Sequence, residues 1–251
     1  FIKDIRFLIR RCPPPKQRIS MLFSATLSYR VTELAYEHMN NPQKIIIESE
    51  QITAEKIKEI GYMVANEEKI SLLLGLLNTL KKSRSIIFIN TKREADKVWG
   101  FLEGNGYKAA IVSGDVPQKK REALLKKFAS NEVSILVATD VAARGLHIEG
   151  VTHVFNYDLP EDSEDYVHRI GRTARAGAEG DAISFVCETY AFSLPEIESF
   201  INHKIPIETI NSDMLARIDP KSRIFIDRKN KVSPQNKANG KAYKQRKNNS
   251  R

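Results

Sequence analysis

The sequence predicts an α/β fold, a doubly wound parallel sheet with helices on both of its faces. Short apolar runs of about four to six residues recur along the chain, and most lack the polar alternation of a half-exposed strand. Such runs are typical of strands that are buried on both faces. Between them lie stretches with helical periodicity, and the connections are short. Repeated units of this kind indicate parallel strands joined by crossover helices.

The expected elements follow from these patterns in chain order. Strands are expected at residues 19–23, 44–47, 57–64, 85–89, 109–112, 134–138, 151–156 and 182–187. Helices are expected at residues 31–39, 67–81, 92–105, 118–129, 164–175 and 190–202. Ser28 and Thr91 stand where a hydroxyl can cap the next helix, and Asn105-Gly106 is a typical helix end.

The chain is expected to hold two folded parts. Residues 1–48 contain two expected strands and one expected helix, which is too little to close a core. We interpret them as the last part of a separate α/β lobe; the alternative is an N-terminal decoration of the main domain. Polar residues 49–56 are expected to link this lobe to a complete domain at 57–212. The chain starts at Phe1 instead of Met, which indicates a piece of a longer protein.

Composition excludes several classes of protein. Of the 251 residues, 41% are hydrophobic and 28% are charged, as in soluble globular proteins. No apolar run approaches the roughly 18 residues that span a bilayer. Cys12 and Cys187 are isolated and match no metal-ligand spacing, so no metal site is expected. Two lone cysteines suit a reducing cytoplasm, and a cytoplasmic protein is expected.

The positive charge lies at the C-terminal end, where residues 213–251 are expected to form a basic disordered tail. Residues 221–251 carry eleven Lys and Arg against one acid, Asp227, a net charge of +10, whereas the other 220 residues sum to −1. So polar a segment cannot bury enough apolar surface to offset its chain entropy. Basic tails of this sort bind polyanions through counterion release; a solvating tail without a ligand is the alternative.

The segment 168–177 carries the strongest functional signal. Arg169, Arg172 and Arg175 are spaced three residues apart, so a helix would place them on one face. Like charges stacked in this way repel, which favours an anionic ligand opposite them. Planar guanidinium groups suit a phosphate. A solvated basic face is the alternative, and the flanking glycines and the leading His168 disfavour it.

Three further segments follow the ends of expected strands. Ser24-Ala25-Thr26 follows strand 19–23, Ser113-Gly114-Asp115 follows strand 109–112, and residues 138–147 follow strand 134–138. The carboxyl edge of a parallel sheet is where ligands bind in open α/β folds. Small hydroxyl groups and backbone N–H groups at helix starts receive phosphates well. The order of these segments indicates one composite site.

Together these segments resemble the C-terminal half of a DEAD-box ATP-dependent RNA helicase. Ser24–Thr26 resembles motif III of that family, 86–91 resembles motif IV, 138–146 resembles motif V and 168–177 resembles motif VI. The resemblance covers about residues 1–212, and its last two motifs are highly specific. It implies a RecA-like second helicase lobe preceded by a remnant of the first lobe. Bacterial members associated with RNA degradation are the most similar, which implies a ribonuclease or an RNA-degrading assembly as a partner.

The resemblance implies that ATP binds between the two lobes. Arg172 and Arg175 would reach its γ-phosphate, and His168 would help to couple the two sites. The other residues implied at the nucleotide are Gly145, His147, Asp140 and Arg169, with Asp140 also pairing with a motif VI arginine. His147 stands where family members often carry an Asp that accepts from the ribose hydroxyl. Two interpretations of His147 stay open: it contacts the ribose of ATP, or it is a surface histidine with no part in the site.

The resemblance also implies an RNA surface that holds the sugar-phosphate backbone and reads few base edges. Its residues would be Thr91, Arg93, Ser113, Gly114, Asp115, Gln118, Arg121 and Thr139. Ser24, Ala25 and Thr26 would link hydrolysis to strand separation across the cleft.

The chain contains neither Gly-x-x-x-x-Gly-Lys-Ser/Thr nor Asp-Glu-Ala-Asp. The residues that cradle the ATP phosphates and hold Mg²⁺ are therefore expected in an N-terminal half, and this chain alone is expected to be inactive. Two other interpretations are open. One is a superfamily-2 helicase acting on DNA, and the other is a non-catalytic module that binds RNA or docks a partner.

Overall fold

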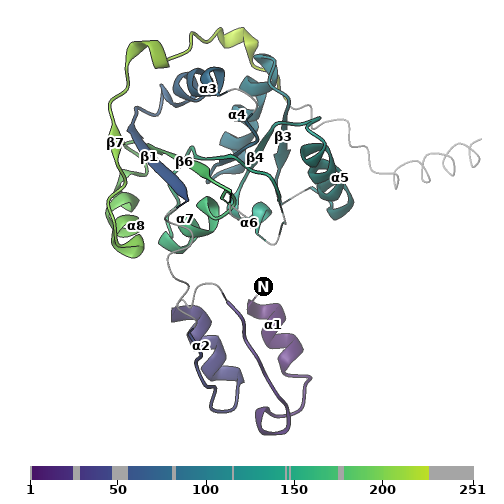
Figure 1. Ribbon diagram of the computed structural model, residues 1–251. Coiled ribbons are helices and arrows are strands. Elements are labelled where there is room, and N and C mark those ends of the chain that lie inside the picture. The colour runs from purple at the N-terminus through teal and green to yellow at the C-terminus, as the bar shows by residue number, and fades with distance from the viewer. Residues whose placement is uncertain are drawn as a thin grey trace, which may run out of the picture. The chain divides into compact units, whose positions relative to one another are not determined.

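The computed structural model describes residues 2–24, 29–46, 56–80, 83–114, 116–144, 146, 148–174 and 178–225. The chain divides into two compact units, Phe1–Ile52 and Thr53–Arg251 (Figure 1). Except for Lys56, the expected linker at 49–56 lies outside the described residues.

The described residues of the unit Phe1–Ile52 form two α-helices and a short 3₁₀ turn. The elements are α1 (Ile2–Ile9), the turn Pro15–Gln17 and α2 (Tyr29–His38). Arg18 ties the turn to α2, since its guanidinium donates to the carbonyls of Pro13 at 2.9 Å and His38 at 2.7 Å. Helix α1 was not expected from the sequence.

The two strands expected in this unit are not formed, so that prediction was wrong. Residues 19–23 and 44–46 have no strand partner within the described part of the unit, and residue 47 lies outside it. Ile19, Met21 and Phe23 keep the alternation of a strand but are 73–88% exposed. A strand exists only when a neighbouring strand satisfies its backbone N–H and C=O groups, and sequence alternation cannot supply that neighbour.

The unit Thr53–Arg251 is built on a seven-stranded sheet in which every pair of neighbours is parallel. The strands are β1 (Ile57–Met63), β2 (Ser85–Phe88), β3 (Ala109–Val112), β4 (Ile135–Ala138), β5 (His153–Asn156), β6 (Gly180–Val186) and β7 (Ile207–Glu208). Their order across the sheet is β3-β4-β2-β5-β6-β1-β7. The predicted α/β class is confirmed. The two-residue edge strand β7 was not expected.

Helices cover both faces of this sheet (Figure 1). They are α3 (Lys69–Thr79), α4 (Lys92–Gly104), α5 (Gln118–Ala129), α6 (Asp140–Ala143), α7 (Ser163–Ile170) and α8 (Leu194–Ile201). Within β2, Ile87 packs into the core formed with α3 and α4. Its neighbours Ile86 and Phe88 pack into the core formed with α5 and α6. Successive residues of this strand thus face opposite layers, which explains the consecutive apolar residues at 86–88.

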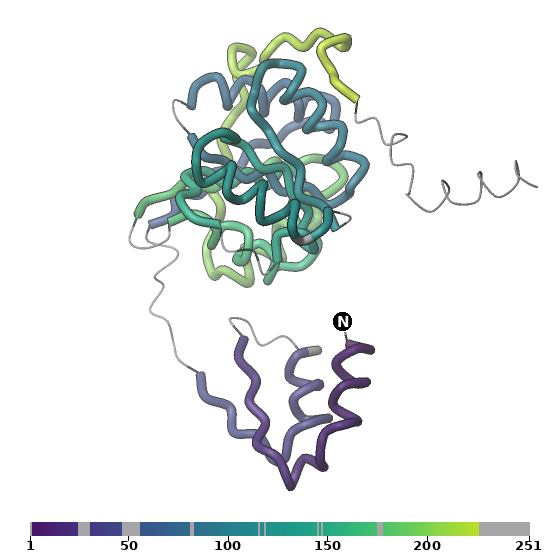
Figure 2. Tube along the Cα trace, turned by 90° about the vertical axis from the view of Figure 1, so that its right-hand side faces the viewer, coloured from purple at the N-terminus to yellow at the C-terminus, as the bar shows by residue number. Residues whose placement is uncertain are grey.

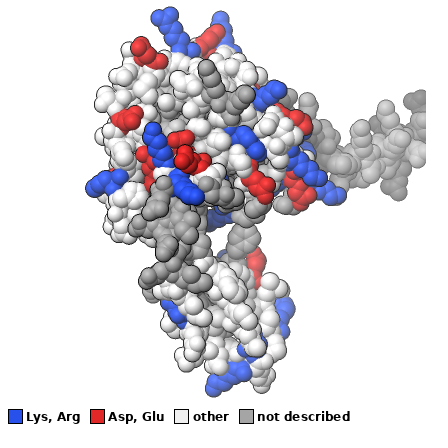
Figure 3. Space-filling view, in the orientation of Figure 1, with Lys and Arg blue, Asp and Glu red and all other residues white. Residues whose placement is uncertain are grey.

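The parallel arrangement brings the carboxyl ends of β2, β3, β4 and β5 to one edge of the sheet. Loops leave this edge after Phe88, Val112, Ala138 and Asn156. On the visible face of the unit, basic and acidic side chains are interspersed (Figure 3). No described helix has the length and apolar character needed to cross a membrane.

The expected domain end at residue 212 differs from the structure. The 3₁₀ turns Ser212–Met214 and Pro220–Ser222 continue the ordered chain beyond residue 212, as far as residue 225. Met214, Leu215 and Ile218 pack against the core beside α3 and α4. These few apolar residues bury enough surface to hold the segment on the domain, although the polar composition of residues 213–251 as a whole predicted disorder. Residues 226–251, where disorder was also expected, lie outside the described residues.

Candidate functional site

Arg169 lies at the centre of the carboxyl edge and is only 1% exposed. Its Nε donates to Asp140 Oδ1 at 2.7 Å, and its Nη2 donates to Asp140 Oδ2 at 2.6 Å. Nη2 also donates to Asn90 Oδ1 at 2.8 Å, and Nη1 donates to the carbonyl of Asp158 at 2.6 Å. The expected pair between Asp140 and a motif VI arginine is therefore formed by Arg169. This guanidinium joins the loops that follow β2, β4 and β5 to helix α7.

Helix α7 ends at Ile170, so the helix expected through residue 175 was wrong. The Thr173 hydroxyl is buried and donates to the carbonyl of Val151 at 2.8 Å, with the carbonyl of Thr152 at 3.1 Å. Ala174 follows with a φ of 53°, in the left-handed region. Contacts with a segment far away in sequence hence turn the chain out of the helix. Arg172 lies beyond the helix, and the common helical face expected for the arginines does not form.

Arg172 is half-buried in the turn that follows α7. Its Nη1 donates to the carbonyl of Leu146 at 2.9 Å. This contact ties the turn to the segment after α6, which also contains the expected nucleotide residues Gly145 and His147. Those two residues and Arg175 lie outside the described residues. The nucleotide contacts of all these residues, and of Arg169, stay predictions.

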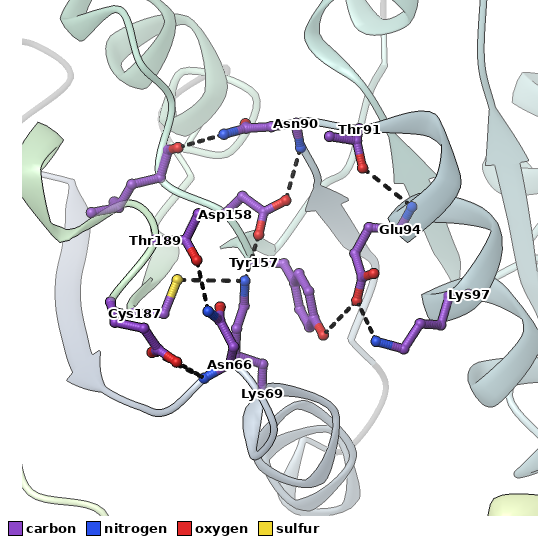
Figure 4. A network of polar contacts seen from close by, with 12 residues as sticks. Asn66, Lys69, Asn90, Thr91, Glu94, Lys97, Tyr157, Asp158, Cys187 and Thr189 are labelled. Carbon is purple, nitrogen blue, oxygen red and sulfur yellow. Dashed lines mark hydrogen bonds and ion pairs between the residues drawn. The ribbon is translucent and has the colours of Figure 1, made fainter.

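Lys69 of α3, Asp158 and Asn90 form a polar network (Figure 4), and Asn90 connects this network to Arg169. Lys69 Nζ pairs with Asp158 Oδ1, and the side chains of both residues are 4% exposed. The backbone N–H of Asn90 donates to Asp158 Oδ2 at 3.0 Å. Asn90 thus receives a hydrogen bond from Arg169 and gives one to Asp158, so it connects the two ion pairs. This network was not expected from the sequence, although Asn90 and Asp158 each stand two residues beyond the end of a buried strand.

Tyr157 closes the network on the side of α4. Lys69 Nζ lies 4.2 Å from the centroid of its ring, and its hydroxyl donates to Glu94 Oε1 at 3.5 Å. Burial, with the nearby carboxylates of Glu94 and Asp158, raises the pKa of Tyr157. The phenol is therefore neutral at every physiological pH and acts here as a hydrogen-bond donor.

His168 lies on α7 beside a second ion pair. Its Nδ1 is 3.8 Å from Asp165 Oδ1, and Arg144 Nη2 donates to Asp165 Oδ2 at 2.8 Å. The neighbouring His168 imidazole, followed by the hydrogen bond from Arg144, lowers the pKa of Asp165 below its usual value despite partial burial. Asp165 likewise raises the pKa of Arg144. Arg144 joins α6 to α7 and was not singled out from the sequence.

The residues expected at RNA lie on loops after three neighbouring strands, β3, β4 and β2. Thr91 is exposed and caps α4 by accepting from the N–H of Glu94 at 3.3 Å, as expected from the sequence. Arg93 is exposed on the first turn of α4, Gly114 is exposed after β3, and Thr139 is half-buried after β4. The edge thus gathers these residues on adjacent loops.

Arg121 braces the loop after β3. Its Nε donates to the carbonyl of Val116 at 2.9 Å, and its Nη2 donates to the carbonyls of Gly114 at 3.1 Å and Ser113 at 3.3 Å. The buried Ser113 and the exposed Gly114 are therefore held by the side chain that was expected to contact RNA itself. Asp115 and the side chain of Gln118 lie outside the described residues.

Of the expected coupling segment, Ser24 is exposed in the unit Phe1–Ile52, whereas Ala25 and Thr26 lie outside the described residues. Within the described part of the chain, no group of three or more His, Cys, Asp and Glu side chains could hold a metal ion. Cys12 is exposed, Cys187 is buried, and both are free thiols.

Residues 68–177 match the family described as Helicase conserved C-terminal domain. The ATP-dependent RNA helicase RhlB of Xanthomonas axonopodis pv. citri is 57% identical over 227 residues, which is 90% of this chain and 40% of that protein. RhlB of Vibrio campbellii is 57% identical over 215 residues, 86% of this chain and 49% of that protein. The chain therefore spans half or less of the length of these relatives.

Solved structures show the same relationship. The E. coli DEAD-box protein SrmB, in a complex with the regulator of ribonuclease activity A, is 34% identical with a TM-score of 0.59. That match covers 65% of this chain and 96% of the SrmB chain. S. cerevisiae Dbp5 bound to RNA and ADP BeF3 is 33% identical with a TM-score of 0.68, over 83% of this chain and 54% of that chain. The chain belongs to the DEAD-box RNA helicase family and carries the RecA-like C-terminal lobe of that family.

Proposed function

We propose that this chain is the C-terminal half of an ATP-dependent RNA helicase that unwinds short RNA duplexes. The observation that carries the proposal is the ion pair between Arg169 and Asp140. It joins the loop of Thr139, expected at RNA, to the segment of Arg172, expected at ATP. A buried guanidinium between these two loops supports a function in which RNA and nucleotide act on one lobe together.

The nucleotide side of the site suits the phosphates of ATP. Arg172 keeps a planar cation in a half-buried turn, where its charge is less screened than it would be in open solvent. Arg172 and Arg175 would contact the γ-phosphate, and Gly145 and His147 would lie at the nucleotide. When bound, ATP supplies the phosphoryl group that is transferred to water. Finger arginines that stabilise the developing charge typically raise the rate about 10³- to 10⁵-fold. The ligands of Mg²⁺ belong to the N-terminal half.

The RNA side of the site suits a sugar-phosphate backbone. Thr91 and Gly114 are exposed on the loops after β2 and β3, the two strands that flank β4, and Arg93 adds an exposed cation. By bracing the loop after β3, Arg121 would keep the backbone N–H groups of that loop in place for phosphate oxygens. Contacts of this kind carry little base preference, so low sequence specificity is expected.

The proposed cycle requires both halves of the protein. The lobes would close on ATP and RNA and bend one strand, so that a short duplex separates. Hydrolysis would then restore the open state, with Ser24, Ala25 and Thr26 linking the two events. By similarity to the RhlB proteins, the parent protein would act in cytoplasmic RNA degradation beside a ribonuclease.

The test compares the longer protein with this chain. The longer protein should hydrolyse ATP in the presence of RNA, respond weakly to DNA of the same sequence, and separate a short RNA duplex. The chain of 251 residues should bind RNA without ATP turnover. Equal stimulation by DNA would support the superfamily-2 DNA helicase, because only recognition of the 2′-OH separates the two ligands. RNA binding without turnover by the longer protein would support a non-catalytic module.

A further inference from the structure

Residues 211–225, named here the C-terminal strap, run across the outer surface of α3 and α4 (Figures 1 and 2). The N–H of Ala216 donates to the carbonyl of Ser71 on α3 at 3.1 Å. Farther along, the N–H of Ile224 donates to the carbonyl of Gly100 on α4 at 3.0 Å. Backbone hydrogen bonds at both helices hold the strap in one register.

Three glycines let the strap approach the helices closely. A Cβ atom at Gly75 would lie 1.8 Å from the Met214 carbonyl oxygen. One at Gly100 would lie 2.1 Å from the Ile224 oxygen, and one at Gly104 would lie 1.4 Å from the Ser222 oxygen. Each distance is far below van der Waals contact, so any side chain at these positions would displace the strap. Glycine is less favourable than alanine within a helix, so its place at all three contacts indicates a steric requirement of the strap.

The end of the strap runs along α4 toward the expected RNA residues. Ser222 lies at Gly104, at the end of α4, whereas Ile224 lies at Gly100, one turn closer to the start of α4. The chain therefore leads from the C-terminal end of α4 in the direction of Arg93 and Thr91. At 1.5 Å per residue, the distance along α4 from Gly100 to Thr91 is about 14 Å.

At this end the strap presents an aromatic ring with a stacked cation. Phe225 is 71% exposed, and the Arg223 guanidinium carbon lies 4.4 Å from the centroid of its ring. The same guanidinium lies 5.9 Å from the ring of Phe101 on α4. Among the described residues, no carboxylate pairs with Arg223; its side chain is half-buried, and its Nε is enclosed without a hydrogen-bond partner. Exposed aromatic rings beside cations are the features by which proteins hold unpaired bases of nucleic acids.

We propose that Phe225 and Arg223 form a stacking site for an unpaired RNA base, and that Gly100 and Gly104 fix this site on α4. The site extends the RNA path from Thr91 and Arg93 along the helix. The proposal rests on the RNA binding proposed above. Stacking adds affinity that does not depend on salt, unlike the counterion release expected from the basic tail.

The first test measures binding of the complete chain to a fluorescent single-stranded RNA over a range of salt concentrations. Phe225→Ala should weaken binding at least about fivefold with an unchanged salt slope, and Phe225→Trp should retain binding. The matched control is Phe192→Ala, because Phe192 is also largely exposed, at 64%, and lies on the turn before α8. Binding to a blunt RNA duplex should not change with Phe225→Ala, since a paired base is not free to stack.

Equal single-stranded affinity for Phe225→Ala and Phe192→Ala would overturn the stacking site and leave the proposed function intact. Failure of the unaltered chain to bind RNA would overturn both. Loss of self-association by Phe225→Ala at unchanged RNA affinity would identify the exposed ring as a contact between copies of the chain, against the proposal.

The second test concerns the glycines. Alanine in the middle of a helix is ordinarily stabilising relative to glycine. Gly100→Ala should instead release the strap, expose residues 211–225 to limited proteolysis and weaken RNA binding as much as Phe225→Ala does. The double variant should bind no more weakly than either single variant, because both remove the same contact. A Gly100→Ala chain with a protected strap and unchanged RNA affinity would overturn the role of the glycines.

Discussion

Arg169 and Asp140, which lie 29 residues apart in sequence, form a two-pronged ion pair in which both carboxylate oxygens accept, at 2.7 and 2.6 Å. The arginine is 1% exposed, and the Asp140 side chain is 21% exposed. The pair holds the end of α7 against the start of α6. The position of Arg172, three residues after Arg169, therefore depends on a carboxylate that belongs to another loop.

Asp140→Ala should destabilise the chain strongly, because it leaves the Arg169 charge buried without a carboxylate. Loss of one partner of a buried pair typically costs about 3–5 kcal/mol of unfolding free energy. Chemical denaturation of the complete chain measures this. The double variant Asp140→Ala with Arg169→Met should recover part of the loss. A cost below about 1 kcal/mol for Asp140→Ala would mean that solvent or other residues satisfy the charge.

Arg172→Lys should lower the ATPase turnover of the longer protein at least about tenfold, because lysine lacks the planar guanidinium group. The affinity for RNA should be preserved. Turnover and RNA binding are measured on the same preparation. Arg217→Lys, on an exposed residue of the C-terminal strap, serves as the control and should change neither. Equal loss of turnover and RNA affinity with Arg172→Lys would instead make Arg172 an RNA ligand.

Deletion of residues 226–251 should lower RNA affinity and flatten its dependence on salt. The deleted segment carries nine Lys and Arg and one acid. Each phosphate that the segment no longer neutralises should reduce the slope of log affinity against log salt by about 0.7 for a single strand. The deletion begins at 226 because residues 221–225 belong to the strap packed on α4. An unchanged salt slope would show that the segment does not bind RNA.

Asp165→Asn should make the stability of the folded chain less sensitive to a fall in pH. His168 and Arg144 lower the pKa of Asp165 in the folded chain, so its ionised form stabilises the fold. That stabilisation is present above the unfolded pKa of about 4 and disappears as the pH falls through the lowered value. Melting temperatures at a series of acidic pH values should therefore fall less steeply for Asp165→Asn. The control Asp213→Asn changes an exposed turn residue, and its melting temperature should depend on pH as that of the unaltered chain does. The same pH dependence for Asp165→Asn and the unaltered chain would contradict the stabilising role of ionised Asp165.

Several features followed from local sequence alone. The apolar runs at β2 and β4 identified buried parallel strands, since a strand covered on both faces lacks the alternation of polar and apolar residues. The carboxyl edge followed from the same reasoning, because parallel strands end together. Thr91 was recognised as a helix cap, which needs only residues three positions apart.

Other features depended on residues that are distant in sequence. Neither the pairing of Lys69 with Asp158 nor the link through Asn90 has a signal in residue spacing. The sequence keeps a helical periodicity up to residue 175, so it predicts a helix that is too long. In the folded chain the Thr173 hydroxyl donates to the carbonyl of Val151, and α7 ends before it.

The sequence by itself determined the class of the fold, the edge that holds the site and the family of the chain. These rest on periodicity and on short motifs, which are local properties. Only the tertiary structure decided where the helix of Arg169 ends, which carboxylate holds that arginine and how far the ordered domain extends past residue 212. Those outcomes depend on burial and hydrogen bonds between segments that meet only when the chain has folded, so no local pattern could carry them.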